Sequence, residues 1–206
     1  MACIQETRWA SAKCRDIGDG YKLYYKGSPS KKNGVGIVVS EMLRDNVLEV
    51  SRISDRLMSL KINLEENMLR VVCCYAPQVG CTDLEKEHFW NELGEHLRTF
   101  SASEHVLLAG DLNGHVGATR NGFPQTHGGN GFGSRNEDGE RILAWAEAHD
   151  LAIANTFYRK RESHLVTYES GGRRTQIDYW LLRRTDLKLA MDCKVQYATP
   201  SWKHMS

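Results

Sequence analysis

Two side chains able to bind a metal or activate a nucleophile follow a short apolar run near the middle of the chain. The run, residues 106–109, leads through Gly110 into Asp111 and, two positions later, Asn113. An apolar run bounded by polar and glycine residues is typical of a buried strand. Residues two apart on an extended chain face the same side, so the acid and the amide can reach one bound group. A turn closed by an Asx side chain explains the same pattern equally well.

Other acidic and polar side chains also stand at the ends of apolar runs, and together they match the needs of phosphodiester hydrolysis. That reaction requires a divalent cation to neutralise phosphoryl charge, a group that activates water, and hydrogen-bond donors for the transition-state oxygens. Considered singly, each side chain has an ordinary structural explanation, such as a solvated acid, a rim aromatic or a strand-favouring threonine. The further candidates are Glu6, Tyr75, Thr167, Asp178 and His204.

The first half of the chain is predicted to be rich in β-strands. Apolar residues alternate strictly over residues 58–64, which predicts a strand with one face on a core and the other towards water. Pro77 ends the following strand, because proline lacks the backbone donor that a sheet needs, and leaves Tyr75 at the strand end. The predicted strands cover residues 2–4, 21–25, 34–40, 47–51, 58–64 and 69–75.

Two helices are predicted after these strands. Phe89, Leu93 and Leu97 recur at helical spacing over residues 82–100, and Thr82 with Glu85 fits a capping box. A second helix is expected over residues 138–149. Further strands are expected at residues 106–111, 151–154 and 193–195, and a hairpin is expected to pair residues 166–168 with 176–182 through a turn at 171–174.

The segment from residue 114 to residue 136 is rich in Gly and Asn and has no periodicity, which indicates a functional surface loop. Its histidines, His115 and His127, lack the spacing of a helical or Cys/His metal site. We interpret both as solvated loop residues.

The length, apolar content, charge and cysteine pattern of the chain limit the class of protein to which it can belong. The 206 residues are 41% hydrophobic and contain no apolar run long enough to span a membrane, so one domain over residues 1–206 is expected. A formal net charge of +1 neither supports nor excludes a nucleic-acid partner. The six cysteines form no C-x-x-C pair, and the N-terminal residues do not resemble a secretory signal. We therefore expect an intracellular protein, in the nucleus or the cytoplasm.

Four short motifs occur in a characteristic order. They are Gln-Glu-Thr at residues 5–7, Tyr-Ala-Pro at 75–77, Gly-Asp-Leu-Asn at 110–113 and Gln-Ile-Asp-Tyr at 176–179. In order and approximate spacing the chain resembles the endonuclease/exonuclease/phosphatase superfamily, whose fold is like that of deoxyribonuclease I. In four segments the amino-acid sequence is similar to that of the endonucleases of RTE-type LINE retrotransposons and the related craniofacial development protein 2-like family. The segments are residues 3–9, 155–157, 167–168 and 172–179.

The resemblance implies an α/β fold, a four-layer sandwich of two mixed β-sheets face to face with helices outside, and Mg²⁺-dependent nicking of DNA, with Mn²⁺ as a substitute. It implies a role for each candidate residue. These roles are metal ligand for Glu6, donors to substrate phosphate for Tyr75 and Thr167, activation of water for Asp111, stabilisation of the phosphorane for Asn113, and orientation of a catalytic histidine, His204, by Asp178.

The resemblance also implies a first strand, carrying an Asn near the metal, ahead of the strand expected at residues 2–4, and another strand after His204, and these 206 residues contain neither. We therefore expect a partial domain that lacks the first and last strands of the family. DNA is the expected partner, with Arg173 and Arg174 gripping backbone phosphates, and a reverse transcriptase is expected as a fused or separate partner. Oligomeric state stays open. The alternatives are an inactive remnant that binds nucleic acid or protein, and a superfamily member acting on abasic DNA or a phosphoinositide.

Overall fold

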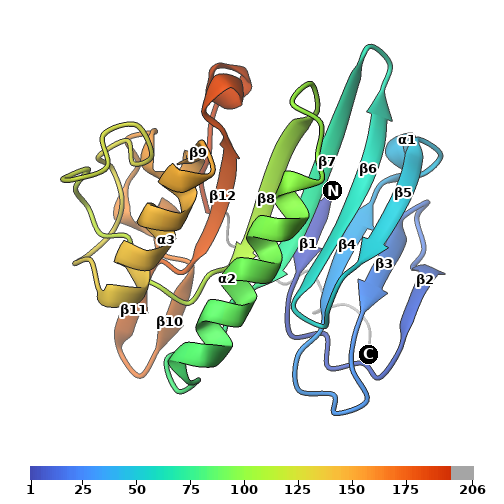
Figure 1. Ribbon diagram of the computed structural model, residues 1–206, viewed down its shortest axis with the longest axis horizontal. Helices are drawn as coiled ribbons and strands as arrows, with labels where there is room; N and C mark the ends of the chain where they lie inside the picture. Colours follow the sequence, from blue (N-terminus) through green and yellow to red (C-terminus); the bar gives the residue numbers. More distant parts are fainter. Residues whose placement is uncertain (196–206) are drawn as a thin grey trace, which may run out of the picture.

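The structure, a computed structural model, describes residues 1–195, and two β-sheets stand face to face in it (Figure 1). Both long helices lie on the outer side of the larger sheet (Figure 1). The α/β sandwich that the sequence predicted is confirmed, with its long helices on one of the two outer faces. His204 lies outside the described residues.

The smaller sheet, sheet A, is built entirely from the first forty residues. Its strand order is β1-β4-β3-β2, and every neighbouring pair is antiparallel. Strand β2 escaped prediction because all five of its residues are exposed and it carries no apolar alternation. The strands are β1 (Ala2–Ile4), β2 (Ala12–Asp16), β3 (Lys22–Lys26) and β4 (Val35–Val39).

The larger sheet, sheet B, has the order β5-β6-β7-β8-β12-β9. The pair β7–β8 is parallel because helix α2 carries the chain back across the sheet between these strands, whereas the other pairs are antiparallel. Its strands are β5 (Val47–Arg52), β6 (Leu57–Leu64), β7 (Asn67–Tyr75), β8 (His105–Asp111), β9 (Leu151–Ile153) and β12 (Asp178–Arg183).

Sheet B is buried on both faces. Met58, Leu60 and Ile62 of β6 pack against sheet A, whereas Leu57 on the other face packs beneath the helices. The prediction that the second face of this strand meets water is wrong at Ser59, which is fully buried and hydrogen-bonds His96 of α2 at 2.8 Å. The helix that covers this face explains the difference, since alternation alone does not reveal a covering layer.

The helices begin close to the predicted positions. Helix α2 (Asp83–Arg98) has the predicted capping box, in which Thr82 accepts from the Glu85 backbone and Glu85 accepts from the Thr82 backbone. Helix α3 (Glu137–Ala148) is capped by the Asn136 side chain. The one-turn helix α1 (Glu41–Arg44) contributes Leu43 to the core between the sheets. No helix within residues 1–195 is long and apolar enough to cross a membrane.

The predicted pairing of residues 166–168 with 176–182 is wrong. Strands β10 (Tyr168–Ser170) and β11 (Arg173–Thr175) instead form a separate two-stranded ribbon. Gly171 and Gly172 both have positive φ, which permits a tight two-residue turn between them. Strand β12 then joins sheet B, because its Tyr179 and Leu181 are needed in the core beneath the helices.

Short 3₁₀ helices complete the second half: η1 (Ala154–Thr156), η2 (Glu162–His164) and η3 (Arg184–Leu189). The strand predicted at residues 193–195 is absent from the described structure. There the Val195 backbone N–H donates to the carbonyl of His164 at 2.9 Å, so the segment docks on η2 instead of pairing with a sheet.

Strand β8 lies in the middle of sheet B, and Leu108 on it is fully buried in the core beneath the helices. We expect Leu108→Ala to lower the free energy of unfolding by roughly 2–5 kcal/mol, because it removes apolar contacts and leaves a cavity. Denaturant unfolding measures this. Leu48→Ala on β5 is the matched control, since Leu48 is 57% exposed, and it should change stability by less than about 0.5 kcal/mol. Equal losses in the two variants would contradict the described burial.

Candidate functional site

Three predicted site residues lie side by side at one end of sheet B, on neighbouring strands. Tyr75 ends β7, Asp111 ends β8 and Asp178 begins β12. The registers place Tyr75 opposite Asp111 and Asp111 opposite Asp178, so the three side chains leave the same face. Tyr75 belongs to the core between the sheets, which identifies that face as the one towards sheet A.

Glu6 approaches this row from the other sheet. It follows β1 with a left-handed backbone, φ +52°, and its carboxylate accepts a hydrogen bond from the Tyr75 hydroxyl at 2.7 Å. Arg8 donates to the same carboxylate at 2.8 Å. The hydrogen bond from Tyr75, followed by that from Arg8, lowers the pKa of Glu6. Glu6 is therefore an ionised carboxylate with its charge already partnered.

The surroundings of Asp111 raise its pKa, whereas those of Glu6 lower the pKa of that residue. Burial, and then the negative charges of Asp178 and Glu6, raise its pKa from 3.8 to about 7, although the backbone N–H of Asn113 donates to it at 2.9 Å. Burial also raises the pKa of Asp178. Two carboxyl groups on adjacent strands thus share a site that disfavours double ionisation, which is the arrangement that a positive ligand would relieve.

Asn113 and Thr167 both make contacts that shape the site. Asn113 has φ +50° and donates its side-chain amide to the carbonyl of Ala76 at 2.9 Å, which ties the end of β8 to the end of β7. The Thr167 hydroxyl accepts from the backbone N–H groups of Ile177 and Asp178 at 2.9 and 3.2 Å. Both residues therefore lie at the predicted site, where their polar groups are engaged with the protein.

Three residues near the site were not predicted from the sequence. Gln78 donates to the Tyr75 hydroxyl at 2.8 Å and to Glu6 at 3.4 Å. Arg56 donates to the Tyr75 carbonyl at 3.2 Å and lies 4.9 Å from the centre of its ring. Arg8 pairs with Glu6. Arg8 and Gln78 directly follow two of the four motifs, so their place in the sequence could have indicated that they lie near the site. No motif or pattern in the sequence around Arg56 indicates the same.

Tyr75 is held by these neighbours with its hydroxyl protonated. Burial, and then the hydrogen bond to Glu6, raise the pKa of Tyr75 to about 12. The hydroxyl is therefore a donor at neutral pH, as the predicted contact with a phosphate requires.

Arg173 and Arg174 lie on β11, in the ribbon that extends beyond sheet B next to β12 (Figure 1). Both are exposed. Arg174 pairs with Glu162 at 2.5 Å and lies 3.9 Å from Glu169, so part of its charge is offset. Because Thr167 accepts from Asp178, the base of the ribbon adjoins the site.

The two loop histidines differ from expectation. His127 is fully buried, so its interpretation as a solvated residue is wrong. Its Nδ1 accepts from the backbone N–H of Gly129 and its Nε2 donates to the carbonyl of Gly117, each at 3.0 Å. Burial lowers the pKa of His127 to about 4, so the ring is neutral and anchors the loop. His115 is half-buried.

The donors present fit a hydrated hard cation better than a closed protein cage. Within the described residues no three His, Cys, Asp or Glu side chains are close enough to form a complete metal site. Mg²⁺ usually keeps several waters and binds one or two carboxylates together with substrate phosphate. Glu6, Asp111 and Asp178 supply oxygen donors, and burial, followed by the negative charges of Asp178 and Glu6, raises the pKa of Asp111.

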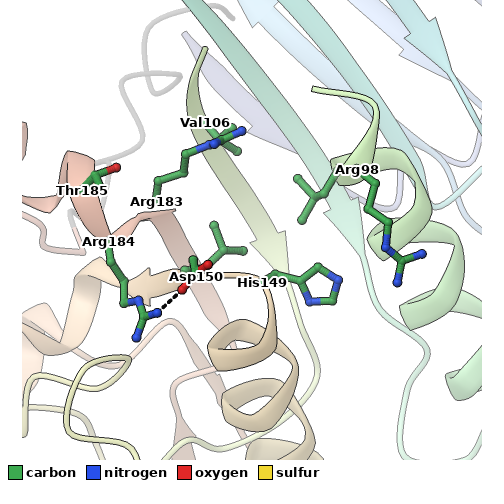
Figure 2. Close-up of a pocket in the computed structure, with 9 residues that line it drawn as sticks. Arg98, Val106, His149, Asp150, Arg183, Arg184 and Thr185 are labelled. Atoms are coloured by element: carbon green, nitrogen blue, oxygen red, sulfur yellow. Dashed lines mark hydrogen bonds and ion pairs between the residues drawn. The ribbon is translucent and has the colours of Figure 1, made fainter. Parts of the chain in front are cut away.

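The hollow drawn in Figure 2 lies at the other end of sheet B, where β8 begins and β12 ends. Its volume is about 520 Å³. Arg184 there pairs with Asp150, and Arg183 donates to the carbonyl of Ser101 at 3.0 Å (Figure 2). The C-terminal ends of α2 and α3 converge on the same place, and their carbonyl dipoles offset positive charge. We therefore do not assign this hollow as the site.

Comparison with known proteins finds relatives in sequence and in fold. The chain matches no sequence-family profile. It is 29% identical over 184 residues to craniofacial development protein 2 of Bos taurus, which covers 88% of this chain and 31% of that protein. The protein of the same name from Tragulus javanicus is also 29% identical over 184 residues, covering 88% of this chain and 32% of that protein. The chain thus spans about a third of the length of these relatives.

Solved structures show the same fold. The endonuclease domain of TRAS1, a telomere-specific non-LTR retrotransposon, matches with a TM-score of 0.60 and 12% identity, covering 84% of this chain and 71% of that one. The AP endonuclease LMAP from Leishmania major matches with a TM-score of 0.64 and 12% identity, covering 90% and 70%. An endonuclease/exonuclease/phosphatase family protein from Leptotrichia buccalis C-1013-b matches with a TM-score of 0.52 and 16% identity, covering 80% and 61%.

The raised pKa of Asp111 predicts a specific pH dependence of stability. An Asp with a pKa of 3.8 when unfolded and about 7 when folded leaves the folded state holding more protons between these values. Its contribution to stability is present below about pH 4 and is lost as pH rises through 7. Asp111→Asn removes this titration. In EDTA, its stability relative to the native chain should rise by up to a few kcal/mol between about pH 4 and 7. A difference independent of pH would contradict the buried carboxylate.

Proposed function

We propose that this chain, which has the fold of the endonuclease/exonuclease/phosphatase superfamily, is a divalent-metal-dependent phosphodiesterase that nicks DNA. The observation that carries the proposal is the row of Tyr75, Asp111 and Asp178 at one end of sheet B, faced by Glu6 from the other sheet. Four residues from distant parts of the chain converge there. Among them are a neutral donor, a partnered carboxylate and two carboxyl groups with raised pKa values.

Asp111 is suited to accept a proton from the attacking water. A carboxylate with its pKa near the working pH combines a sizeable ionised fraction with real basicity, and general bases of this kind contribute about 10²–10⁴-fold to rate. Burial, and then the charge of Asp178 on the adjacent strand, keep that pKa raised. In this proposal, the amide of Asn113 moves from the Ala76 carbonyl to the developing phosphorane charge, and the Tyr75 hydroxyl donates to a phosphate oxygen.

Mg²⁺, with Mn²⁺ as a substitute, is the proposed cofactor, and it would neutralise phosphoryl charge when bound. Glu6 would hold it, supported by the carboxyl groups of the facing row. In the described structure the Arg8 guanidinium occupies the place of a cation on Glu6. We propose that Arg8 leaves this carboxylate when a divalent ion arrives.

We propose DNA as the substrate because the site opens at a sheet edge beside the exposed arginines of β11. We also propose a retrotransposon origin, supported by the likeness in fold to the TRAS1 endonuclease domain. Abasic DNA is the second candidate substrate, since the AP endonuclease from Leishmania major has the same fold. A fused or separate reverse transcriptase and an intracellular location, in the nucleus or the cytoplasm, are parts of the same proposal.

One observation favours the alternative that the surface binds nucleic acid without cutting it. The Glu6 carboxylate already accepts hydrogen bonds from Tyr75, Arg8 and Gln78, so its interactions are satisfied without a metal. DNA binding in EDTA, combined with no nicking in Mg²⁺ or Mn²⁺, would establish this alternative.

Nicking of supercoiled plasmid tests the proposed activity. We expect the chain to convert supercoiled plasmid to the open circle in Mg²⁺ and not in EDTA. Asp111→Ala should lower the rate by at least about 10²-fold because it removes the general base. Asp83→Ala, at an exposed acid in the first turn of α2, is the control and should retain the native rate. Cleavage unaffected by Asp111→Ala would sink the assignment.

Duplexes with and without an abasic nucleotide separate the two candidate substrates. Cleavage confined to the abasic duplex would replace general nicking by a repair-type activity. Competition by a soluble phosphoinositide in the same assay tests the remaining alternative substrate class.

Metal binding has a readout that does not depend on activity. Mg²⁺ that binds the folded chain alone should raise its thermal midpoint, and a dissociation constant of about 1 mM would stabilise it by about 1.4 kcal/mol at roughly 10 mM metal. We expect Glu6→Gln to abolish most of this shift and Glu41→Gln, at a solvated acid in α1, to preserve it. Equal shifts in the two variants would contradict Glu6 as a ligand.

A further inference from the structure

Positive charge is concentrated in the first forty residues. They contain seven Lys or Arg and three Asp or Glu, a net charge of +4. Since the whole chain has a formal net charge of +1, the remaining residues carry −3. Proteins that bind nucleic acid commonly concentrate basic residues on one surface even when their total charge is near zero. The asymmetry therefore directs attention to sheet A, which these residues form.

Five of these basic residues lie on the free edge of sheet A, at the end of β3 and in the turn that follows it, and we name them the basic shelf. Strand β2 is the last strand of this sheet within the described residues, and both of its basic residues are exposed. The residues in the turn are exposed as well. The basic shelf consists of Lys13, Arg15, Lys26, Lys31 and Lys32.

Backbone hydrogen bonds connect the basic shelf to the candidate site. The N–H of Thr7 donates to the carbonyl of Gly34 at 3.2 Å, and the N–H of Arg8 donates to Asn33 at 2.9 Å. The segment that begins at Glu6 therefore runs along the turn that carries Lys31 and Lys32. A phosphate backbone leaving the site on this side would meet these lysines next.

Trp9 gives the shelf a fixed aromatic surface. Its ring packs edge-on against Tyr25 with centroids 4.6 Å apart, and the Arg15 guanidinium lies 5.7 Å from its centre. The Tyr25 hydroxyl is in turn hydrogen-bonded to Ser11 at 3.0 Å. Trp9 remains 38% exposed. A rigid aromatic ring beside several cations is the composition that nucleic-acid surfaces use to hold sugars and bases next to phosphates.

Charged residues on an edge strand also have a simpler explanation. Lysine on such an edge prevents pairing with another chain, which accounts for Lys13 and Arg15 on β2. It does not account for Lys31 and Lys32, which lie in a turn. The backbone N–H of Lys31 closes that turn onto Ser28 at 3.0 Å.

Few acids oppose this charge. Residues 7–15 and 20–40 contain no Asp or Glu. From the neighbouring sheet, Asp55 accepts a hydrogen bond from Asn33 at 3.0 Å, whereas Arg52 donates to the carbonyl of Lys13 at 3.2 Å and so adds a further positive charge. The acids Asp16 and Asp19 follow at the end of β2 away from the turn.

We propose that the basic shelf holds the phosphate backbone of the DNA that flanks the cut, on the side of the site opposite the β10–β11 ribbon. That the bound polymer is DNA rests on the proposed function. It assigns the shelf affinity without sequence preference, because contacts to phosphate carry no base information. The shelf residues touch none of the reacting groups.

Binding measured in EDTA, where nothing is cut, tests the shelf separately from catalysis. The variant is Lys31→Gln/Lys32→Gln, and the control is Arg98→Gln/Lys188→Gln, two exposed residues at the other end of sheet B. Fluorescence anisotropy is recorded with a duplex of about 40 base pairs and one of about 8. Each lost phosphate contact should lower the salt slope of binding by about one. We expect the shelf variant to bind the long duplex at least about fivefold more weakly than the native chain. The slope of log affinity against log salt concentration should fall by about two, because two phosphate contacts are lost. Its affinity for the short duplex should be unchanged.

The outcomes separate the two proposals. Native affinity of the shelf variant for the long duplex, in a chain that still nicks plasmid, overturns the shelf and leaves the function standing. Equal weakening by the control variant also overturns it, because net charge alone would then explain the loss. A chain that binds DNA through the shelf but never nicks overturns the proposed function alone. Unchanged thermal midpoints show that both variants fold.

Discussion

The pairing register of β8 is the constraint on which the site depends. The strand is parallel to β7 and antiparallel to β12, and these two registers place Asp111 beside Tyr75 and Asp178. Because side chains alternate between faces, a slip of one residue would turn Asp111 beneath the helices and separate it from Glu6. The apolar residues of β8 resist that slip, since Leu108 must stay in the helix-side core. Core packing and site geometry are therefore fixed by the same alternation.

The second constraint is the contact between the sheets. Glu6 belongs to sheet A, and the hydrogen bond from Tyr75 joins it to sheet B. The inter-sheet core, which includes Tyr24, Ile37 and Met58, keeps the two sheets together behind this contact. Arg56 holds Tyr75 through its carbonyl and over its ring. The electrostatic character of each acid then follows from its place: Glu6 is exposed enough to be partnered by Arg8, whereas Asp111 lies deeper among other carboxyl groups.

Local sequence patterns predicted the strands and helices that carry the site but not all of their partners. The apolar run before Asp111 and the Pro after Tyr75 were sufficient to locate two strand ends, and the capping box located α2. Strand β2 has no apolar alternation, so only its pairing with β3 reveals it. The placement of β12 beside β8, and the burial of His127, arise from contacts between residues far apart in sequence, which periodicity does not record.

The separation of the site residues along the chain has a consequence for biosynthesis. Glu6 and Asp178 are 172 positions apart, because β12 enters sheet B only after both long helices are complete. At about 5–20 residues per second, a ribosome would add Asp178 roughly 10–35 s after Glu6. Strand β8 ends at Asp111, so it would lack its β12 neighbour and expose an unpaired edge while the next 67 residues are added, for roughly 3–13 s. A nascent chain would thus need protection from aggregation at the strand that carries Asp111.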